Sequence, residues 1–336
     1  MEPILLLAHV EAGGSIGKSA LEALNAALAI DGPLTIGLVG ANAGAAAEQV
    51  AGAGAARILA ISGEAFAQPR YATDTAAAET LCRASGAAIV IAPATARWAR
   101  ALPGVAYRLG GRVDTHATNL AMQNEVPAVT RWFYRQRMEA VLTRSQRPWI
   151  VLLDAGCFEP WSGPAGAATI EQVTVETPQT RTTVTGVQAP KADQQTIRPD
   201  AKLLLVAGAG WTKKQADGAV HAADAEKLIL GFLHRAKASL GGSKSLVDLS
   251  GEGEAVLHCM THLNQIGQTG STPRHPKGLS TCCHGEEPHV VGWRFVSERR
   301  AINLDSNCGW ARGKADVVYV ADAFAVMREV NKLLEG

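Results

Sequence analysis

The fold is decided by three runs within the first forty residues: ILLLAHV at 4–10, SIGKSALEALNAALAI at 15–30 and PLTIGLV at 33–39. The first and third runs are almost wholly apolar, which is typical of strands buried on both faces of a parallel sheet. The middle run has apolar residues at helical spacing. A strand, a helix and a second strand in this order predict the start of an α/β domain with a parallel sheet.

The same alternation continues along the chain. Strands are predicted at 56–61, 87–92, near 113–120 and at 149–153, and helices at 43–52, 73–85 and 95–109. Because the strand-like runs are apolar throughout, helices are expected on both faces of the sheet. The first part of the chain is therefore predicted to be a doubly wound α/β domain.

The composition changes after Pro160. Residues 168–176 alternate like a strand with one solvated face, and residues 177–200 are rich in Thr, Gln, Pro and Lys without a periodic apolar face. A second strand–turn–helix pattern then begins, with a helix from about 217 to 239. We therefore predict two doubly wound parallel-sheet domains, 1–176 and 201–336, joined by an exposed linker at 177–200.

Bulk properties exclude several classes of protein. The net charge of +1 over 336 residues gives no electrostatic reason to expect nucleic acid or an anionic membrane as partner. The N-terminus lacks the basic region of a signal peptide, and no apolar run approaches the length of a membrane-spanning helix. The six unevenly spaced cysteines do not form a disulfide framework. We expect a cytoplasmic protein with reduced thiols and no direct membrane insertion.

Two glycine-containing turns raise the question of phosphate binding. Residues 13–19 (GGSIGKS) are similar to a P-loop, but the pattern needs a glycine where Ala12 stands. The competing interpretation is an ordinary helix start with Ser15 as N-cap. Gly208-Ala209-Gly210 is half of a dinucleotide fingerprint and fits either a tight turn or a backbone approach to a phosphate.

Further polar residues stand near predicted strand ends. Residues 241–245 (GGSKS) are predicted to form a turn that enters a strand, where Ser243 and Lys244 would face a pyrophosphate or a charged ring; alternatively, Gly241 ends a helix. Asn303, Asp305 and Asp316 have side chains that suit an adenine or a ribose, or that cap turns.

Cysteines and histidines gather in the C-terminal part, at Cys259, Cys282, Cys283, Cys308, His258, His262, His284 and His289. Adjacent cysteines rarely ligate one tetrahedral ion, and no C-x-x-C pair is present. Buried thiols, or thiols beside a cofactor, are therefore favoured over a metal-bearing redox subunit that uses Cys282, Cys283 and Cys308.

Several stretches together resemble the alpha subunit of electron transfer flavoproteins over nearly the whole chain. The stretches are Leu6–His9, 20–24, 108–114 (RLGGRVD), 129–134, the tetrapeptide 267–270 (GQTG), His289 with Gly292, Asn303-x-Asp305 and Ala315-Asp316. The order and spacing of these stretches carry the resemblance, because any one alone would be unspecific.

The resemblance implies an electron carrier without substrate turnover of its own. Such subunits hold FAD in a Rossmann-like C-terminal domain and pair through the first domain with a beta subunit, which contains AMP or a second flavin in some complexes. Electrons would arrive from a flavin or iron–sulfur dehydrogenase and leave to an acceptor such as a membrane quinone oxidoreductase. The second domain is expected to swivel on the 177–200 linker.

The resemblance also implies a set of FAD-binding residues: Gly208, Gly210, Ser243, Lys244, Gln268, Thr269, Gly270, His284, Gly285, His289, Asn303, Asp305 and Asp316. Lys244 would lie over the isoalloxazine ring, Gln268 and Thr269 would reach the ring and its N5 edge, and His289 would face O2. Asn303 and Asp316 would hold the adenosine half. A cation and a histidine beside the ring would stabilise the negative charge that develops on reduction.

This sequence departs from the family pattern in the cofactor region. Ala209 and Lys244 stand where the family has arginines, Ser271 replaces a lysine, and 282–286 (CCHGE) replaces Gly-Ile-Ser-Gly-Ala. The alternative to a FAD carrier is therefore a structural subunit that has lost FAD. A free-standing P-loop NTPase is a second alternative, disfavoured by Ala12.

Overall fold

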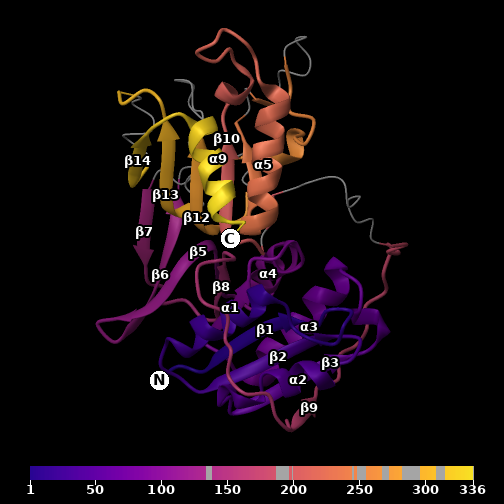
Figure 1. The fold of residues 1–336 in the computed structure, drawn as a ribbon. Helices are drawn as coiled ribbons and strands as arrows, with labels where there is room; N and C mark the ends of the chain where they lie inside the picture. Colours follow the sequence, from indigo (N-terminus) through magenta and orange to yellow (C-terminus); the bar gives the residue numbers. More distant parts are fainter. Residues whose placement is uncertain are drawn as a thin grey trace. The chain divides into compact units, whose positions relative to one another are not determined.

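The computed structural model describes residues 1–133, 138–186, 197–198, 200–243, 246–247, 255–266, 272–281, 296–307 and 315–335. The chain forms two compact units, Met1–Gln188 (unit 1) and Ala189–Gly336 (unit 2). The boundary falls inside the 177–200 stretch, whose described residues contain neither helix nor strand. Each unit has a parallel-rich sheet with helices, so the predicted α/β class is confirmed (Figure 1).

Unit 1 contains one large sheet. Its strands are β1 (Ile4–His9), β2 (Leu34–Gly40), β3 (Arg57–Ser62), β4 (Ile89–Pro93), β5 (Arg112–Gln123), β6 (Val126–Phe133), β7 (Met138–Leu142), β8 (Trp149–Leu153) and β9 (Ile170–Gln172). In the described part of unit 1 they follow the order β7-β6-β5-β8-β4-β1-β2-β3-β9. The β5–β6 and β6–β7 pairs are antiparallel and the other neighbours are parallel. The chain order reverses between β1 and β4, which makes this pair the topological switch point.

Helices cover both faces of this sheet, as predicted for a doubly wound domain. They are α1 (Lys18–Leu28), α2 (Gly44–Gln49), α3 (Tyr71–Ser85) and α4 (Ala96–Arg108). Ile4, Leu6 and Ala8 of β1 share a core with α1 and α2, whereas Leu5 and Leu7 share a second core with α3 and α4. A strand whose alternate residues enter two cores must be apolar throughout, which explains the run at 4–10.

Three expectations for unit 1 need correction. Helix α1 begins at Lys18 with Gly17 as N-cap, and Ser15 is not the cap because its carbonyl accepts the Glu11 N–H. The strand expected at 168–176 is only Ile170–Gln172, at the edge of the sheet. Strands β6 and β7 were not predicted, because these partly exposed antiparallel strands lack a continuous apolar run.

Unit 2 is built on a smaller sheet, which is wholly parallel in its described part. Its strands are β10 (Leu203–Ala207), β11 (Ser239–Gly242), β12 (His275–Thr281), β13 (Val296–Asn303) and β14 (Val317–Val320), in the order β11-β10-β12-β13-β14. The switch point lies between β10 and β12. Helices α5 (Ala222–Ala236) and α9 (Ala323–Leu333) lie side by side on one face and share a core with Leu205 and Ile302 (Figure 1). The short helix η3 (Ala209–Thr212) follows β10.

Two expectations for unit 2 are wrong. Helix α5 starts at Ala222 and not near 217, because residues 214–220 form a turn closed by a bridge between Lys214 and Val220. Gly241 and Gly242 belong to β11 and neither form a turn nor end the helix, whose C-cap is Lys237 with a φ of 50°. A Cβ on Gly242 would lie 2.2 Å from Met260 Cε, so the flexible end of the Met260 side chain packs against this glycine.

None of the helices in the described ranges has both the length and the apolar character needed to span a bilayer.

Candidate functional site

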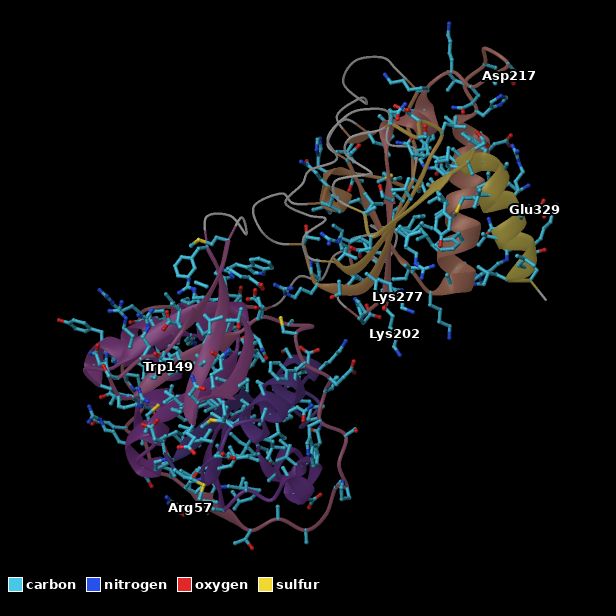
Figure 2. All side chains as sticks on the ribbon, turned by 90° about the vertical axis from the view of Figure 1, so that its left-hand side faces the viewer. Arg57, Trp149, Lys202, Asp217, Lys277 and Glu329 are labelled. Carbon is cyan, nitrogen blue, oxygen red and sulfur yellow. The ribbon has the colours of Figure 1, made fainter. Side chains whose placement is uncertain are left out.

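The carboxyl ends of the parallel strands in unit 2 gather most of the described residues that the sequence pointed to. Gly208 follows β10, Ser243 follows β11 and Asn303 ends β13. Figure 2 shows Lys202 and Lys277 at the amino end of this sheet and Asp217, in the turn after η3, at the carboxyl end. Ligands of open α/β sheets bind outside the carboxyl ends, so this edge is the candidate site.

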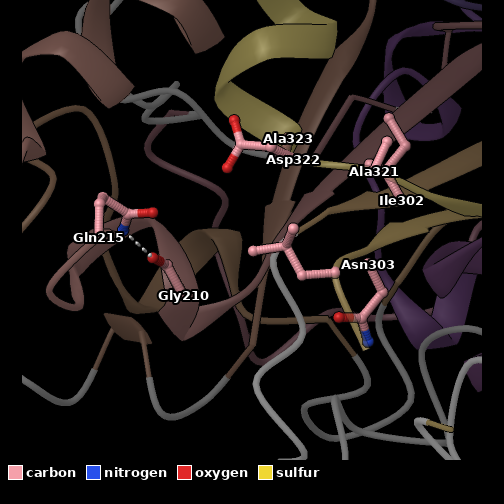
Figure 3. A pocket seen from close by; sticks show the side chains of 8 residues that line it. Gly210, Gln215, Ile302, Asn303, Ala321, Asp322 and Ala323 are labelled. Atoms are coloured by element: carbon pink, nitrogen blue, oxygen red, sulfur yellow. Dashed lines mark hydrogen bonds between the residues drawn. The ribbon is translucent and has the colours of Figure 1, made fainter. Parts of the chain in front are cut away.

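A shallow pocket, whose empty space of about 300 Å³ includes open solvent, lies at this edge between η3 and the start of α9. Figure 3 shows Gln215 and Gly210 on one side, Asn303 on the other, and Asp322 where α9 begins. The residues that line it are Gly210, Gln215, Ile302, Asn303, Leu304, Ala321, Asp322 and Ala323. The pocket is shallow and open to solvent, so the described residues form part of the wall of a site and do not enclose a ligand.

The turn after β10 forms the first wall. The Gly208 N–H donates to the Thr281 carbonyl at 2.8 Å, and the Gly210 carbonyl accepts from Gln215 Nε2 at 3.1 Å. Ala209 between them is only 3 % exposed. Ala209 therefore packs into unit 2, and its methyl group offers no cation to a ligand.

Asn303 forms the opposite wall. Its side chain is 5 % exposed, and Oδ1 accepts the Asp305 N–H at 3.3 Å. Asp305 Oδ1 in turn accepts the Asn307 N–H at 2.8 Å. Both side chains thus shape the turn that leaves β13, as the turn-capping interpretation expects, and Asn303 also faces the pocket.

Asp322 is a pocket residue that the sequence interpretation missed. It is the N-cap of α9, with Oδ1 accepting the Ala325 N–H at 2.7 Å. An Ala-Asp dipeptide flanks β14 on each side, at 315–316 and 321–322. The available signal was the strand VVYV at 317–320: only the second Ala-Asp follows it and so lies at a carboxyl end.

Asp316 lies at the other end of β14. Its N–H donates to the Arg299 carbonyl at 2.7 Å, and its carboxylate accepts from the backbone N–H and guanidinium of Arg299 at 2.7 and 3.1 Å. The Arg299 N–H and then its guanidinium lower the pKa of Asp316. Arg299 is four residues before Asn303, about 13 Å along the sheet. The structure therefore does not bring Asp316 together with Asn303.

Ser243 is buried directly after β11. Its N–H donates to the Ala207 carbonyl at 3.0 Å, and its Oγ accepts the Leu246 N–H at 3.3 Å. The Ser243 hydroxyl is therefore held by the Leu246 N–H, close to the carboxyl end of β10.

The remaining candidate residues lie outside the described part of the chain. They are Lys244, Gln268, Thr269, Gly270, His284, Gly285 and His289, and the cysteines 282, 283 and 308 also lie there. The ranges that are described hold no group of three or more His, Cys, Asp or Glu side chains arranged for a metal ion. Burial, and then the charge of Glu226, raise the pKa of Cys259 to about 12, so this thiol stays protonated and is a poor ligand.

The P-loop-like stretch of unit 1 does not form a phosphate cradle. An antiparallel bridge between Val10 and Ile16 closes it into a hairpin, in which the Gly14 N–H donates to the Glu11 carbonyl. The Glu11 carboxylate lies against Gly17, where a Cβ would be 2.2 Å from its Oε1. The stretch is thus a short hairpin with the Glu11 carboxylate beside the N-terminus of α1, an arrangement that disfavours a bound phosphate and argues against the NTPase alternative.

Comparison with protein families agrees with this architecture. The family described as "Electron transfer flavoprotein domain" matches residues 4–178, more than half of the chain. The chain therefore belongs to the electron transfer flavoprotein family, whose members generally bind flavin and work with partner subunits and dehydrogenases. No curated protein matches the chain.

Proposed function

We propose that this protein is the alpha subunit of an electron transfer flavoprotein and carries electrons through a FAD bound at the carboxyl edge of unit 2. The observation that supports this most is the pocket that brings Gly210, Asn303 and Asp322 together at that edge. The family match covers nearly all of unit 1, and the resemblance to alpha subunits extends into unit 2.

The described walls fit the adenosine part of the cofactor. Asn303 lines the pocket with a carboxamide, and the Asp322 carboxylate accepts hydrogen bonds from hydroxyl groups such as those of a ribose. Gly210 lines the pocket without a side chain, which allows a close approach of the ligand. We propose Asp322 in place of Asp316 for the adenosine contact, because Asp316 is paired with Arg299 at the amino end.

The flavin end of the site is proposed from the resemblance. Ser243, Lys244, Gln268, Thr269, Gly270, His284, Gly285 and His289 would surround the ring and the diphosphate, together with Gly208. The flavin, when bound, supplies reversible acceptance of electrons. Lys244 and His289 would place positive charge and a hydrogen-bond donor where negative charge develops on the ring, which favours the reduced cofactor.

The partners follow from the same proposal. Unit 1 would bind a beta subunit that contains AMP or a second flavin in some complexes. A flavin or iron–sulfur dehydrogenase would donate electrons, and a membrane quinone oxidoreductase is the proposed acceptor. Action in the cytoplasm and rotation of unit 2 on the 177–200 linker stay predictions.

The test is a visible absorption spectrum of the chain purified with a co-expressed beta subunit, before and after acid release of the chromophore. About one FAD per complex in the supernatant is expected. A complex that remains colourless after incubation with FAD would contradict the proposal, and iron in the protein fraction would point to the cysteines at 282, 283 and 308 instead.

One observation favours a second candidate, a structural subunit without FAD. Ala209 is buried in η3, so the turn lacks the cation that the family places beside the cofactor. Under this alternative the complex assembles with the beta subunit but contains no flavin in this chain. The same spectrum, combined with gel filtration of the complex, separates the two candidates.

A further inference from the structure

Trp211 lies directly beneath the pocket. It is fully buried in η3 and follows Gly210, which lines the first wall. Its indole Nε1 donates a hydrogen bond of 2.8 Å to Thr281 Oγ1. The indole N–H of a buried tryptophan needs a partner, and here the partner belongs to another strand.

Thr281 connects this bond to the ends of two neighbouring strands. It is the last residue of β12 and is itself fully buried. Its hydroxyl donates to the Val206 carbonyl of β10 at 3.3 Å while accepting from the indole. Its carbonyl accepts the Gly208 N–H at 2.8 Å. Hydrogen bonds through Thr281 therefore link η3 to β10 and β12, the two strands on either side of the switch point.

The other edge of the indole contacts the second wall. The rings of Trp211 and Phe324 have centroids 4.6 Å apart at an interplanar angle of 58°. Phe324 is the second residue of α9, next to the pocket residue Ala323 and two residues after Asp322. Ile302, which precedes Asn303, belongs to the same core as Trp211. Trp211 therefore contacts α9, which carries Asp322 at its start, and shares a core with the strand that ends at Asn303.

We propose that Trp211 is a positioning residue for the ligand site: its hydrogen bond to Thr281 holds the Gly210 turn against the end of β12, and its ring contact with Phe324 fixes the start of α9 relative to that turn. The identity of the ligand as FAD rests on the proposed function. The role of Trp211 rests on the contacts above. Displacement of a wall by a fraction of an ångström is enough to weaken binding, because the ligand contacts depend on both walls at once.

The alternative to a positioning role is that Trp211 only fills volume in the core. Trp211→Phe keeps an aromatic ring near Phe324 and removes the N–H donor. Thr281→Val keeps the shape of the side chain and removes the hydroxyl, whereas Thr281→Ser keeps the hydroxyl. Thr281→Val removes the acceptor of the indole N–H and also the hydrogen bond of the hydroxyl to the Val206 carbonyl. If the indole hydrogen bond carries the effect, adding Trp211→Phe to Thr281→Val therefore causes no further loss of affinity.

Unit 1 offers a matched control. Trp149 is also fully buried, and its Nε1 donates to Asp114 Oδ2 at 2.9 Å. Trp149→Phe loses the same kind of hydrogen bond in the unit that does not contain the pocket. It is expected to lower the urea midpoint without changing ligand affinity.

The experiment measures Kd for FAD, and separately for ADP, with the flavin-free complex of this chain and its beta subunit, alongside urea unfolding. Trp211→Phe and Thr281→Val are each expected to raise Kd about tenfold. Thr281→Ser and Trp149→Phe are expected to stay within twofold of the wild type. Kd values of Trp211→Phe and Thr281→Val within twofold of the wild type, or an equal rise in Trp149→Phe, would overturn the inference.

The two ligands separate this inference from the proposed function. Wild-type binding of ADP without FAD would remove the FAD proposal, and the Trp211 role would then be decided by the ADP values. A wild-type complex that binds neither ligand would overturn both.

Discussion

The carboxyl edges of the two sheets are built in opposite ways. In unit 1 the last residue of β1, His9, stacks on Trp98 of α4 with ring centroids 3.7 Å apart, and the Glu11 carboxylate lies against the N-terminus of α1. In unit 2 the corresponding edge opens into a pocket between η3 and α9. Strand order alone marks both edges as places for a ligand. The residues that follow each strand decide whether the edge is filled or open.

The difference extends to the use of charge and polarity. Asp114, one of the buried carboxylates of unit 1, accepts hydrogen bonds from three side chains of its own sheet and the adjoining loop. In unit 2 the polar groups Asn303 and Asp322 each hold a turn or a helix start and also face the pocket. Polar substitutions in unit 1 should therefore affect stability, and those at the pocket should affect binding.

The largest expected effect is that of Asp114→Asn. Asp114 is 2 % exposed and accepts from Arg131 Nη1 at 3.0 Å, Arg144 Nε at 2.8 Å and Trp149 Nε1 at 2.9 Å. Burial alone would raise the pKa of Asp114, but these hydrogen bonds outweigh it and lower the pKa. We expect the free energy of unfolding, measured with urea, to fall by about 3 kcal/mol. This is at the lower end of the cost of breaking a buried ion pair, because both arginines are partly exposed.

Asp74→Asn is the matched control for this prediction. Asp74 is equally buried, but only Oδ1 accepts hydrogen bonds, from Arg97, and Oδ2 is 3.6 Å from Arg100. Burial raises the pKa of Asp74 in spite of these arginines. Its replacement should cost about 1 kcal/mol, and both variants should bind FAD like the wild type. If both variants lost the same unfolding free energy, or if either changed the affinity for FAD, polar groups of unit 1 could no longer be assigned to stability alone.

A smaller effect is expected at the pocket, where the two Ala-Asp dipeptides provide a direct test. Asp322→Ala should weaken FAD binding about thirtyfold, the equivalent of about 2 kcal/mol for a charged hydrogen bond. Asp322→Asn keeps a good N-cap for α9 and separates the loss of charge from the loss of the cap. Asp316→Ala should leave FAD affinity unchanged in equilibrium titrations of the complex. An equal loss in Asp316→Ala would place the adenosine contact at the amino end of β14 instead.

The smallest effect concerns the closed edge of unit 1. Neither ring nitrogen of His9 has a partner of normal hydrogen-bonding geometry in the described part of the chain. Burial, and then the charge of Arg97, lower the pKa of His9 from 6.5 to about 2, against an opposing contact with the Val39 carbonyl. Below pH 6.5 the unfolded chain therefore binds a proton that the folded chain does not, and stability falls as the pH falls towards 2.

His9→Phe keeps a ring for Trp98 to stack on and removes this titration. Between pH 7 and pH 5.5 the loss of unfolding free energy should be smaller than in the wild type by about 1 kcal/mol. His234→Phe, at an exposed position of α5, serves as control and should leave the difference unchanged. A wild-type pH dependence in His9→Phe would mean that His9 is not held neutral.

The parts of the fold that could be predicted are those with a strong local signal. Apolar runs such as 4–10 and 87–92 predicted strands that the structure confirms as Ile4–His9 and Ile89–Pro93. The β6–β7 hairpin could not be predicted, because its stability comes from pairing with β5 and not from a local apolar pattern. The prediction for Gly241 and Gly242 was wrong because glycine is common in turns, and only their pairing with Val206 and Ala207 of β10 makes them part of a strand.

The same limit applies to the candidate site. Asn303 and Gly210 could be predicted as pocket residues because each stands just after or at the end of an apolar strand. Asp322 was missed because two identical dipeptides flank the short strand β14, and the sequence does not say which end faces a ligand. Trp211 carried no signal, since its hydrogen bond joins residues seventy positions apart.

The most direct test of the central claim is hydrogen exchange of the complex with its beta subunit, with and without bound FAD. If FAD binds at the carboxyl edge of unit 2, backbone amides in peptides from 203–215, 296–307 and 315–327 exchange more slowly when FAD is bound. Amide exchange in peptides from 4–19 and 89–100 stays unchanged. Slower exchange confined to the peptides of unit 1, or no change at the carboxyl edge of unit 2 while FAD is bound, would contradict the claim.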